Sequence, residues 1–318
     1  MTVILWILAA LLALYLLACL VIALLACRRF SGAWDPMKGL THATDKLLAP
    51  YRDMIDAGSD WLLSHPSEPV ELTSFDGLRL RARLYVNPEA KALLVACHGY
   101  RSSGVRDFAS AMRFYHDHGM SILLIDQRAA GESEGRYITF GVRESVDVRD
   151  WCALMQQRYP QLPILLAGIS MGASSVLMTA DDLPDHVAAL LADCGYDDPW
   201  GEFRYVARHY MTPAAVLLVP GVDLFCRLIC GFGLKERSAS AALRRTKLPV
   251  FFVHGEADEL VPCGDSQRNR EACAGPTAIF TVPGAAHGFS YLLDPEGYHK
   301  AVGEFLRAFV FSEERVRR

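Results

Sequence analysis

Hydrophobic residues fill the start of the chain without interruption and then recur in short runs. Val3 to Cys27 is an unbroken stretch of 25 apolar residues. As a helix rising about 1.5 Å per residue it would cover roughly 37 Å, more than a bilayer core of about 30 Å. A buried helix in the core of a soluble domain normally keeps a polar face. The pattern therefore predicts a single transmembrane helix over residues 3–27. Together with the two residues before it, this helix forms a membrane anchor at 1–27.

A cleaved signal peptide is the main alternative for this segment. Only Met1 and Thr2 precede the apolar run, whereas a signal peptide carries a basic leader. The letters of residues 24–27 loosely resemble a lipoprotein cleavage site. Arg28 and Arg29 follow the run directly. The positive-inside bias then predicts that the rest of the chain lies on the cytoplasmic side of the membrane.

Beyond the anchor, the pattern first predicts a linker, a helix and a hairpin. Residues 28–41 contain glycine, proline and mixed polar residues and are typical of a linker. Residues 42–65 carry apolar positions at helical spacing. The segments 70–74 and 78–86 alternate around Asp76-Gly77, which is typical of a β-hairpin.

From residue 92 onward, short apolar runs alternate with longer helical stretches. This order predicts an α/β fold with a mostly parallel sheet and helices on both faces. Strands are expected at 92–97, 121–125, 164–167, 188–192, 250–253 and 278–282, and helices at 105–118, 142–159, 171–180 and 298–311.

One stretch breaks the alternation. Nearly sixty residues separate the strand ending near Ala192 from the strand starting at Val250, and residues 203–235 among them are apolar and aromatic. The stretch is too long for a plain crossover, and it predicts a helical insertion over the site. The resulting organisation is an anchor (1–27), a linker and N-terminal helix (28–67), a core (68–195 and 241–318) and a lid (196–240). The apolar character of the lid could also reflect ordinary packing.

Composition narrows the possible functions only slightly. The net charge is −4 with interleaved signs, so the concentrated basic patch of a nucleic-acid-binding protein is absent. Nine irregularly spaced cysteines form no CxxC pair, which gives a zinc site no support. Several of them lie in apolar runs, where a free cysteine behaves as a small buried hydrophobic residue, and this mildly favours a reducing compartment. No cofactor or metal is implied, and nothing in the sequence indicates an oligomeric state.

The strongest chemical motif is Gly168-Ile169-Ser170-Met171-Gly172. It follows an apolar strand and opens a helical stretch, the setting in which a G-x-S-x-G motif forms a nucleophile elbow. Gly168 and Gly172 leave room for the sharp turn. The turn places Ser170 at a helix N-terminus, where the dipole favours developing negative charge. An ordinary helix-capping serine is the alternative interpretation.

A serine hydroxyl needs a base, and the base needs an acid. His287 lies in the small-residue loop 284–288 after the last expected strand, where ligands bind at the edge of a parallel sheet. Asp258 follows the strand at 250–253. The order Ser170, Asp258, His287 matches that of Ser-Asp-His hydrolases. Asp193, at the end of an earlier strand, is the alternative acid.

An oxyanion formed at Ser170 needs two hydrogen-bond donors. The backbone N–H of Met171 directly follows the nucleophile. The second donor is expected from the loop His98-Gly99-Tyr100-Arg101, and we choose the N–H of Tyr100. His98 is expected to bind the loop rather than act as a second base.

These motifs in this order resemble the α/β-hydrolase superfamily over about residues 68–312. The resemblance rests on His98-Gly99, the segment 126–135, the elbow around Ser170, and the loops of Asp258 and His287. Within the superfamily the chain looks most like bacterial membrane-anchored serine hydrolases, described as esterases or as serine-aminopeptidase-like proteins. Ala129 and Ala130 depart from the common D-x-R-G-x-G-x-S form. That segment shapes a loop near the nucleophile, so the triad is unaffected.

The resulting hypothesis is a serine hydrolase that acts through an acyl-enzyme on carboxylic esters. An apolar lid and an anchor favour a hydrophobic or lipid-like acyl ester. A thioester or a small peptide amide would use the same machinery, so a peptidase remains an alternative. A membrane-tethered binding protein without catalytic activity is an alternative of another class.

Overall fold

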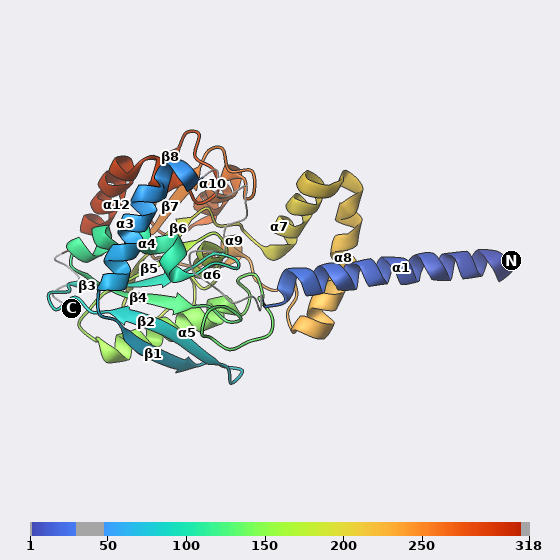
Figure 1. Cartoon of the computed structure of the whole chain (residues 1–318), viewed down its shortest axis with the longest axis horizontal. Coiled ribbons are helices and arrows are strands. Elements are labelled where there is room, and N and C mark those ends of the chain that lie inside the picture. Colours follow the sequence, from blue (N-terminus) through green and yellow to red (C-terminus); the bar gives the residue numbers. More distant parts are fainter. Residues whose placement is uncertain (1, 30–47, 313–318) are drawn as a thin grey trace.

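The computed structural model describes residues 2–29 and 48–312, in which a mixed sheet forms the centre (Figure 1). The eight strands of the described residues lie in the order β1-β2-β4-β3-β5-β6-β7-β8. β1 and β2 are antiparallel to their neighbours, and the strands from β4 to β8 are parallel. Their bounds are β1 Glu68–Thr73, β2 Arg79–Tyr85, β3 Ala92–Cys97, β4 Met120–Asp126, β5 Ile164–Ile169, β6 Val187–Asp193, β7 Val250–Gly255 and β8 Thr277–Val282.

Helices cover both faces of this sheet because its central strands are apolar on both sides. In β3, Leu93, Val95 and Cys97 belong to one core and the residues between them to the other. α5 (Glu144–Arg158), α6 (Met171–Met178) and α9 (Ala239–Leu243) contribute to the first core. The second core contains side chains of α3 (Arg52–Ser64), α4 (Gly104–Asp117) and α12 (Pro295–Phe309).

The predicted layers and strands therefore agree with the structure. The hairpin turns at Gly77, whose φ of 84° suits glycine. The helix predicted over 42–65 contains the 3₁₀ turn η1 Ala49–Tyr51 before α3, and two shorter helices that the pattern did not indicate are α10 Cys263–Ala272 and α11 Ser290–Leu293. Most of the predicted linker, the first residues of the predicted helix at 42–65 and the last six residues of the chain lie outside the described residues.

The N-terminal helix α1 (Thr2–Cys27) projects away from the sheet, and a second helical unit crosses it (Figure 1). We call residues 199–230 the cap. It consists of α7 (Pro199–Val206), a π-helical turn η2 (Ala207–Met211), a 3₁₀ segment η3 (Pro213–Leu218), α8 (Val219–Phe225) and a π-helical turn η4 (Cys226–Cys230). Among the described residues, Thr2–Cys27 and Pro213–Cys230 are long and apolar enough to cross a membrane.

The C-terminal end of α1 is hydrogen-bonded to the domain that holds the sheet. The last carbonyl groups of a helix lack intrahelical partners. Here Arg101 donates to the Leu25 oxygen at 2.5 Å, and the Tyr100 hydroxyl donates to the Ala26 oxygen at 2.8 Å. The Ile138 N–H donates to the Cys27 oxygen at 2.6 Å. α1 is thus fixed at this end.

Candidate active site

Ser170 stands at a sharp turn between β5 and α6. Its φ of 56° and ψ of −121° are strained values for a residue with a side chain. The Ser170 N–H donates to the Asp193 backbone oxygen at 2.8 Å, which ties the turn to β6. This strained turn exposes the serine side chain above the end of the strand, which is characteristic of a nucleophile elbow.

The two elbow glycines are required by close backbone contacts. A Cβ on Gly172 would lie 2.0 Å from the Cys97 carbonyl oxygen, at the end of β3. A Cβ on Gly168 would lie 2.4 Å from the Gly172 carbonyl carbon. No side chain fits at either position, so both glycines allow the turn to sit against β3.

The structure brings Ser170, His287 and Asp258 together from three separate loops. They follow β5, β8 and β7, whose carboxyl ends meet at one edge of the sheet. His287 Nε2 lies 2.8 Å from Ser170 Oγ, and His287 Nδ1 lies 2.7 Å from Asp258 Oδ2. Because a carboxylate only accepts, Nδ1 carries the proton. Nε2 is then free to accept the serine proton.

Asp258 is held as a carboxylate by several donors. The N–H groups of Leu260 and Val261 both donate to Oδ1 at 2.9 Å. Burial alone would raise the pKa of Asp258, but hydrogen bonds from His254 and His287 outweigh it and lower this pKa to about 2. Asp258 therefore stays ionised at neutral pH beside His287.

His254, at the end of β7, is a site residue that the sequence analysis missed. Its Nε2 lies 2.9 Å from the Val261 oxygen and 3.2 Å from Asp258 Oδ2, so this nitrogen carries a proton. Its Nδ1 then accepts from the Ser266 hydroxyl at 2.7 Å. His254 is fully buried and orients the Asp258 carboxylate. In the sequence, the signal that could have identified His254 was a histidine at the end of a strand, four residues before Asp258.

The alternative acid, Asp193, does not contact His287 through its carboxylate. Its Oδ1 is buried without a hydrogen-bond partner among the described residues. Burial raises the pKa of Asp193 to about 6. Its backbone oxygen accepts a hydrogen bond from the Ser170 N–H. Asp193 therefore has a structural role in the site, and its carboxylate does not orient His287.

The expected oxyanion loop lies against Ser170. A Cβ on Gly99 would be 3.3 Å from Ser170 Cβ, and the Gly99 N–H already donates to Asp107 Oδ2 at 2.7 Å. The Tyr100 N–H, by contrast, has no acceptor within the part of the chain that the structure describes. The Met171 N–H is at the first position of α6, where helices leave their N–H groups unpaired. Both amides are thus available for an oxyanion.

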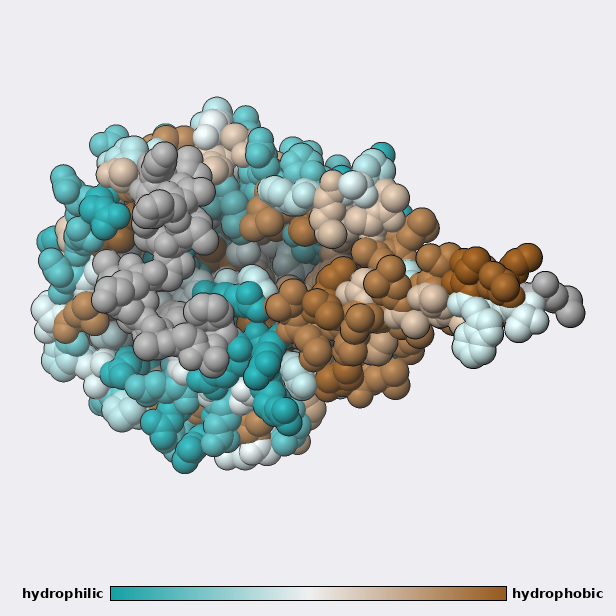
Figure 2. Space-filling view, turned by 45° about the vertical axis from the view of Figure 1, so that its right-hand side comes forward, coloured by the Kyte–Doolittle hydropathy of each residue, from teal (hydrophilic) through white to brown (hydrophobic). Residues whose placement is uncertain are grey.

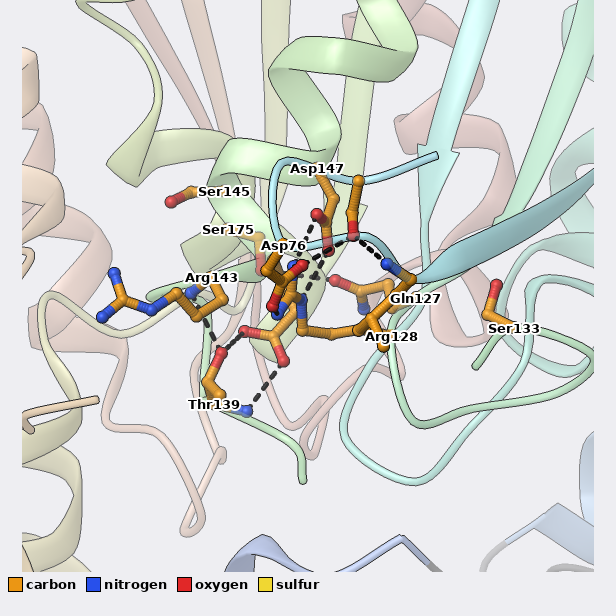
Figure 3. Close-up of polar contacts among 12 residues, drawn as sticks. Asp76, Gln127, Arg128, Ser133, Thr139, Arg143, Ser145, Asp147 and Ser175 are labelled. Carbon is orange, nitrogen blue, oxygen red and sulfur yellow. Dashed lines mark hydrogen bonds and ion pairs between the residues drawn. The ribbon is translucent and has the colours of Figure 1, made fainter. Parts of the chain in front are cut away.

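His98 and Gln127 connect the loops under the site. His98 Nδ1 lies 2.8 Å from the Gly99 oxygen, and the Gln127 N–H donates to His98 Nε2 at 3.2 Å. The Gln127 side chain donates to the His98 oxygen and approaches Ser175 of α6 (Figure 3). As expected from the sequence, His98 binds the loop.

The motif around Arg128 is a buried ionic support next to these loops (Figure 3). Arg128 forms a two-point contact with Asp147 of α5 at 2.6 and 2.7 Å, and it also bonds to Asp76 of the hairpin turn. Burial raises the pKa of Asp147 to about 6 despite the Arg128 contact. The segment therefore joins the hairpin, β4 and α5, consistent with a structural role for Arg128.

Ser170 lies between two cavities of about 310 Å³ each. The first is almost entirely apolar and is bounded by α1, the cap and the elbow, with Ile22, Ala26, Leu218 and Val222 among its walls. The second is more polar, includes His287, Asp107 and Arg106, and lies on the α3 and α4 side. The two cavities give the two parts of a substrate different surroundings.

Glu202 of α7 is the acidic side chain in the apolar cavity. Its Oε2 is buried without a hydrogen-bond partner among the described residues. Burial, with a smaller contribution from the Asp258 charge, raises the pKa of Glu202 to about 8. The carboxyl group is therefore largely neutral at pH 7. The sequence analysis did not single out Glu202.

One group of three side chains in the described residues has ligand atoms close enough for a metal ion: Cys194, Asp258 and His287. The two His287 nitrogens already face Asp258 and Ser170. Burial raises the pKa of the Cys194 thiol well above its ordinary value, which disfavours the thiolate that binds metals. The cluster is better suited to proton transfer.

Comparisons with known proteins find sequences that are similar to this chain. A family model described as serine aminopeptidase, S33, matches residues 88–196. The protein YqkD of Bacillus subtilis is 29% identical over 67% of this chain and 70% of its own length. A membrane protein of Saccharomyces cerevisiae, YNL320W, is 23% identical over 76% of this chain and 80% of its own.

Solved structures give the same result for the fold. The esterase Pf2001 of Pyrococcus furiosus superposes with a TM-score of 0.64 at 23% identity, over 89% of this chain and 97% of its own. The likeness confirms the predicted α/β-hydrolase fold.

Proposed function

We propose that this chain, a member of the α/β-hydrolase superfamily, is a serine hydrolase that cleaves hydrophobic acyl esters. The observation that carries the proposal is the continuous hydrogen-bonded chain from Ser170 through His287 to Asp258. This geometry supports the proposal, because acyl transfer of this kind needs an activated nucleophile, a base and an orienting acid.

Acylation begins when His287 Nε2 takes the proton of the Ser170 hydroxyl. The serine oxygen attacks the ester carbonyl carbon, and the carbonyl oxygen becomes an oxyanion. The backbone N–H groups of Tyr100 and Met171 donate to it, which stabilises the negative charge where it develops. Asp258 stabilises the imidazolium of His287 while the proton resides there.

His287 then donates this proton to the alcohol oxygen, and the bond between the acyl carbon and that oxygen breaks. The alcohol leaves on the side of the more polar cavity, which His287 lines. A water molecule repeats the sequence on the acyl-enzyme, with His287 as base, and releases a carboxylic acid and free Ser170.

The apolar cavity favours an acyl chain as the group retained on the enzyme. Its walls are almost wholly aliphatic and aromatic side chains, and Glu202 in it is largely neutral at pH 7. Burying an alkyl chain in such a cavity gains about 0.8 kcal/mol per CH₂ group. We therefore propose a hydrophobic acyl ester rather than a small polar one.

An aminopeptidase-like amide hydrolase is the second candidate, and the match to the S33 aminopeptidase model favours it. Such an enzyme binds a substrate ammonium group, which needs an ionised acid. Glu202 is the acid in the apolar cavity, and a bound ammonium group would favour its ionised form. The rest of the cavity is almost wholly apolar, which suits an alkyl chain better than a charged amine and makes the ester our first choice.

We also propose that α1 spans a membrane once and that residues 196–240 act as a lid. Arg28 and Arg29 follow α1, so the catalytic domain is proposed to lie on the cytoplasmic side. Protease accessibility in sealed inverted and right-side-out vesicles tests the orientation. Digestion of the catalytic domain only in right-side-out vesicles would contradict it.

The full chain in detergent should hydrolyse p-nitrophenyl esters, with kcat/KM rising from acetyl to medium acyl length. Aminoacyl p-nitroanilides should be cleaved at least about a hundredfold more slowly. Faster cleavage of the anilides would replace the ester proposal with the peptidase. If the folded protein cleaves neither substrate, the result would favour the alternative of a non-catalytic binding protein.

A further inference from the structure

We propose that the cap docks into the bilayer beside α1, and that the apolar cavity at Ser170 receives its acyl chain directly from the lipid phase. The identity of the chain as substrate rests on the proposed esterase function. The docking of the cap does not, because it follows from the geometry of α1 and the cap.

The contacts between the cap and α1 place the cap beside the lipid that surrounds α1. Every described residue from Thr2 to Leu14 is exposed, whereas the cap covers one face of α1 from Tyr15 onward. The Tyr15 hydroxyl donates to the Leu217 oxygen at 3.1 Å, and a Cβ on Gly221 would lie 2.4 Å from Cys19 Sγ. The cap therefore lies along the second half of the apolar run, which ends at Cys27 directly before Arg28 and Arg29.

Basic residues that directly follow an apolar run mark the end of a membrane-spanning segment, so the part of α1 that carries the cap lies within the bilayer. The end of α1 is fixed to the catalytic domain through Tyr100, Arg101 and Ile138. A membrane that holds α1 thus also sets the depth of the cap.

The cap presents apolar side chains where this argument places lipid. Leu217 is 72% exposed and Leu228 is 70% exposed, values that would be unfavourable in water. Figure 2 shows that this apolar surface is continuous with that of α1, while the catalytic domain beside it is mostly polar. The other large apolar residues exposed on the cap are Tyr210, Met211, Leu224 and Ile229.

The charges of the cap also suit a membrane surface. Arg204 and Arg208 are exposed, and the acidic Asp223 is paired with Arg227 at 2.9 Å. Glu202 faces the apolar cavity. The surface therefore carries an excess of basic side chains, which anionic headgroups attract.

The apolar cavity connects this surface with the nucleophile. Its walls include Ile22 and Ala26 of α1 and Leu218 and Val222 of the cap, and it ends at Ser170. Met211 also lines it and is 58% exposed on the cap. An acyl chain between α1 and the cap would reach Ser170 without crossing water.

Photo-crosslinking in nanodiscs tests the docking without using catalysis. A benzophenone side chain replaces Leu217, Leu8 of α1 or Leu63 of α3 in the full-length Ser170→Ala chain. Leu63 is 65% exposed and belongs to α3, a helix of the catalytic domain that lies away from the cap (Figure 1), so it is a matched control. After irradiation, mass spectrometry measures phospholipid adducts.

We expect lipid adducts at positions 8 and 217 at least tenfold above position 63. Adducts at position 8 alone, or crosslinks from 217 to a second copy of the chain, would overturn the docking. The absence of adducts at position 8 would overturn it too, because α1 would then lie outside the bilayer. None of these results bears on ester cleavage, so the proposed function is judged separately.

A second measurement tests the route of the substrate. Leu217→Glu should lower turnover of a long-chain ester dissolved in nanodiscs at least about fivefold relative to Leu63→Glu. Leu217 does not line the cavity, so turnover of soluble p-nitrophenyl butyrate should stay unchanged and report intact folding. Equal long-chain turnover in both variants would refute entry from the lipid phase.

Discussion

The role of Asp258 can be tested by replacing it with its amide. Leu260 and Val261 donate to Oδ1, so the carbonyl oxygen of the asparagine in Asp258→Asn should take that place. The NH₂ group then faces His287 Nδ1, which lies 2.7 Å from the present Oδ2. Because the amide donates, Nδ1 must accept, and the imidazole proton moves to Nε2. A protonated Nε2 has no lone pair for the Ser170 proton.

The loss of activity should be large. In a Ser-His-Asp hydrolase the wrong tautomer lowers kcat by about 10⁴-fold, which corresponds to about 5.5 kcal/mol. We expect a decrease of at least about 10³-fold in kcat for p-nitrophenyl butyrate, with KM nearly unchanged. Stopped enzyme assays at pH 7 and thermal unfolding of both proteins measure activity and folding together.

Asp193→Asn is the matched control. Both are buried aspartates at this edge of the sheet, but the Asp193 carboxylate does not bond to His287. This variant should keep kcat within about tenfold of the unmodified protein. The account is refuted if Asp258→Asn folds and loses less than tenfold, or if Asp193→Asn loses as much as Asp258→Asn.

Three further predictions concern the surroundings of the site. Gly172→Ala should destabilise the fold by about 1–3 kcal/mol or more, because the new Cβ would meet the Cys97 oxygen. Gly201→Ala is the control and should not destabilise the fold, because the nearest atom to its Cβ would be 3.7 Å away. Equal thermal unfolding midpoints for the two variants would contradict this prediction. Raising the pH from 7 to 9 should ionise Glu202, whose pKa is about 8, and thereby raise KM for long-chain esters. In the Glu202→Gln variant, KM should stay constant over the same pH range. The same rise of KM in both proteins would exclude Glu202 as the cause of the rise. Burial raises the pKa of Asp193 to about 6, so the folded state holds a proton there that the unfolded chain has already released. As the pH rises from about 4 to about 6, the protein should therefore lose stability relative to Asp193→Asn. A constant difference in unfolding midpoint across that range would argue against a raised pKa.

Much of the fold could be predicted because the relevant signals are local. The strands from β3 to β8 are short apolar runs, and the elbow places Ser170 between one of them and a helix. Parallel strands bring their carboxyl ends to one edge, so the loops of Asp258 and His287 could be expected beside Ser170. These features depend on residues close together in the chain.

The features that were missed depend on contacts between distant segments. Ile22 and Val222 line the same cavity although about 200 residues separate them, and the unbroken apolar pattern of α1 does not distinguish the face that meets the cap. The function of His254 follows from the loop that returns to it at Val261. Glu202 is unusual only because the cap folds over it, and burial changes its pKa.

Labelling with a fluorophosphonate tests the central claim most directly, because this reagent reacts with an activated serine nucleophile. The full-length protein is treated in detergent, and peptide mass spectrometry identifies the modified residue. The account predicts a stoichiometric adduct on Ser170 that is absent in Ser170→Ala and forms at least about a hundredfold more slowly in His287→Ala. Folded protein that remains unlabelled, or that is labelled elsewhere at the same rate, would contradict it.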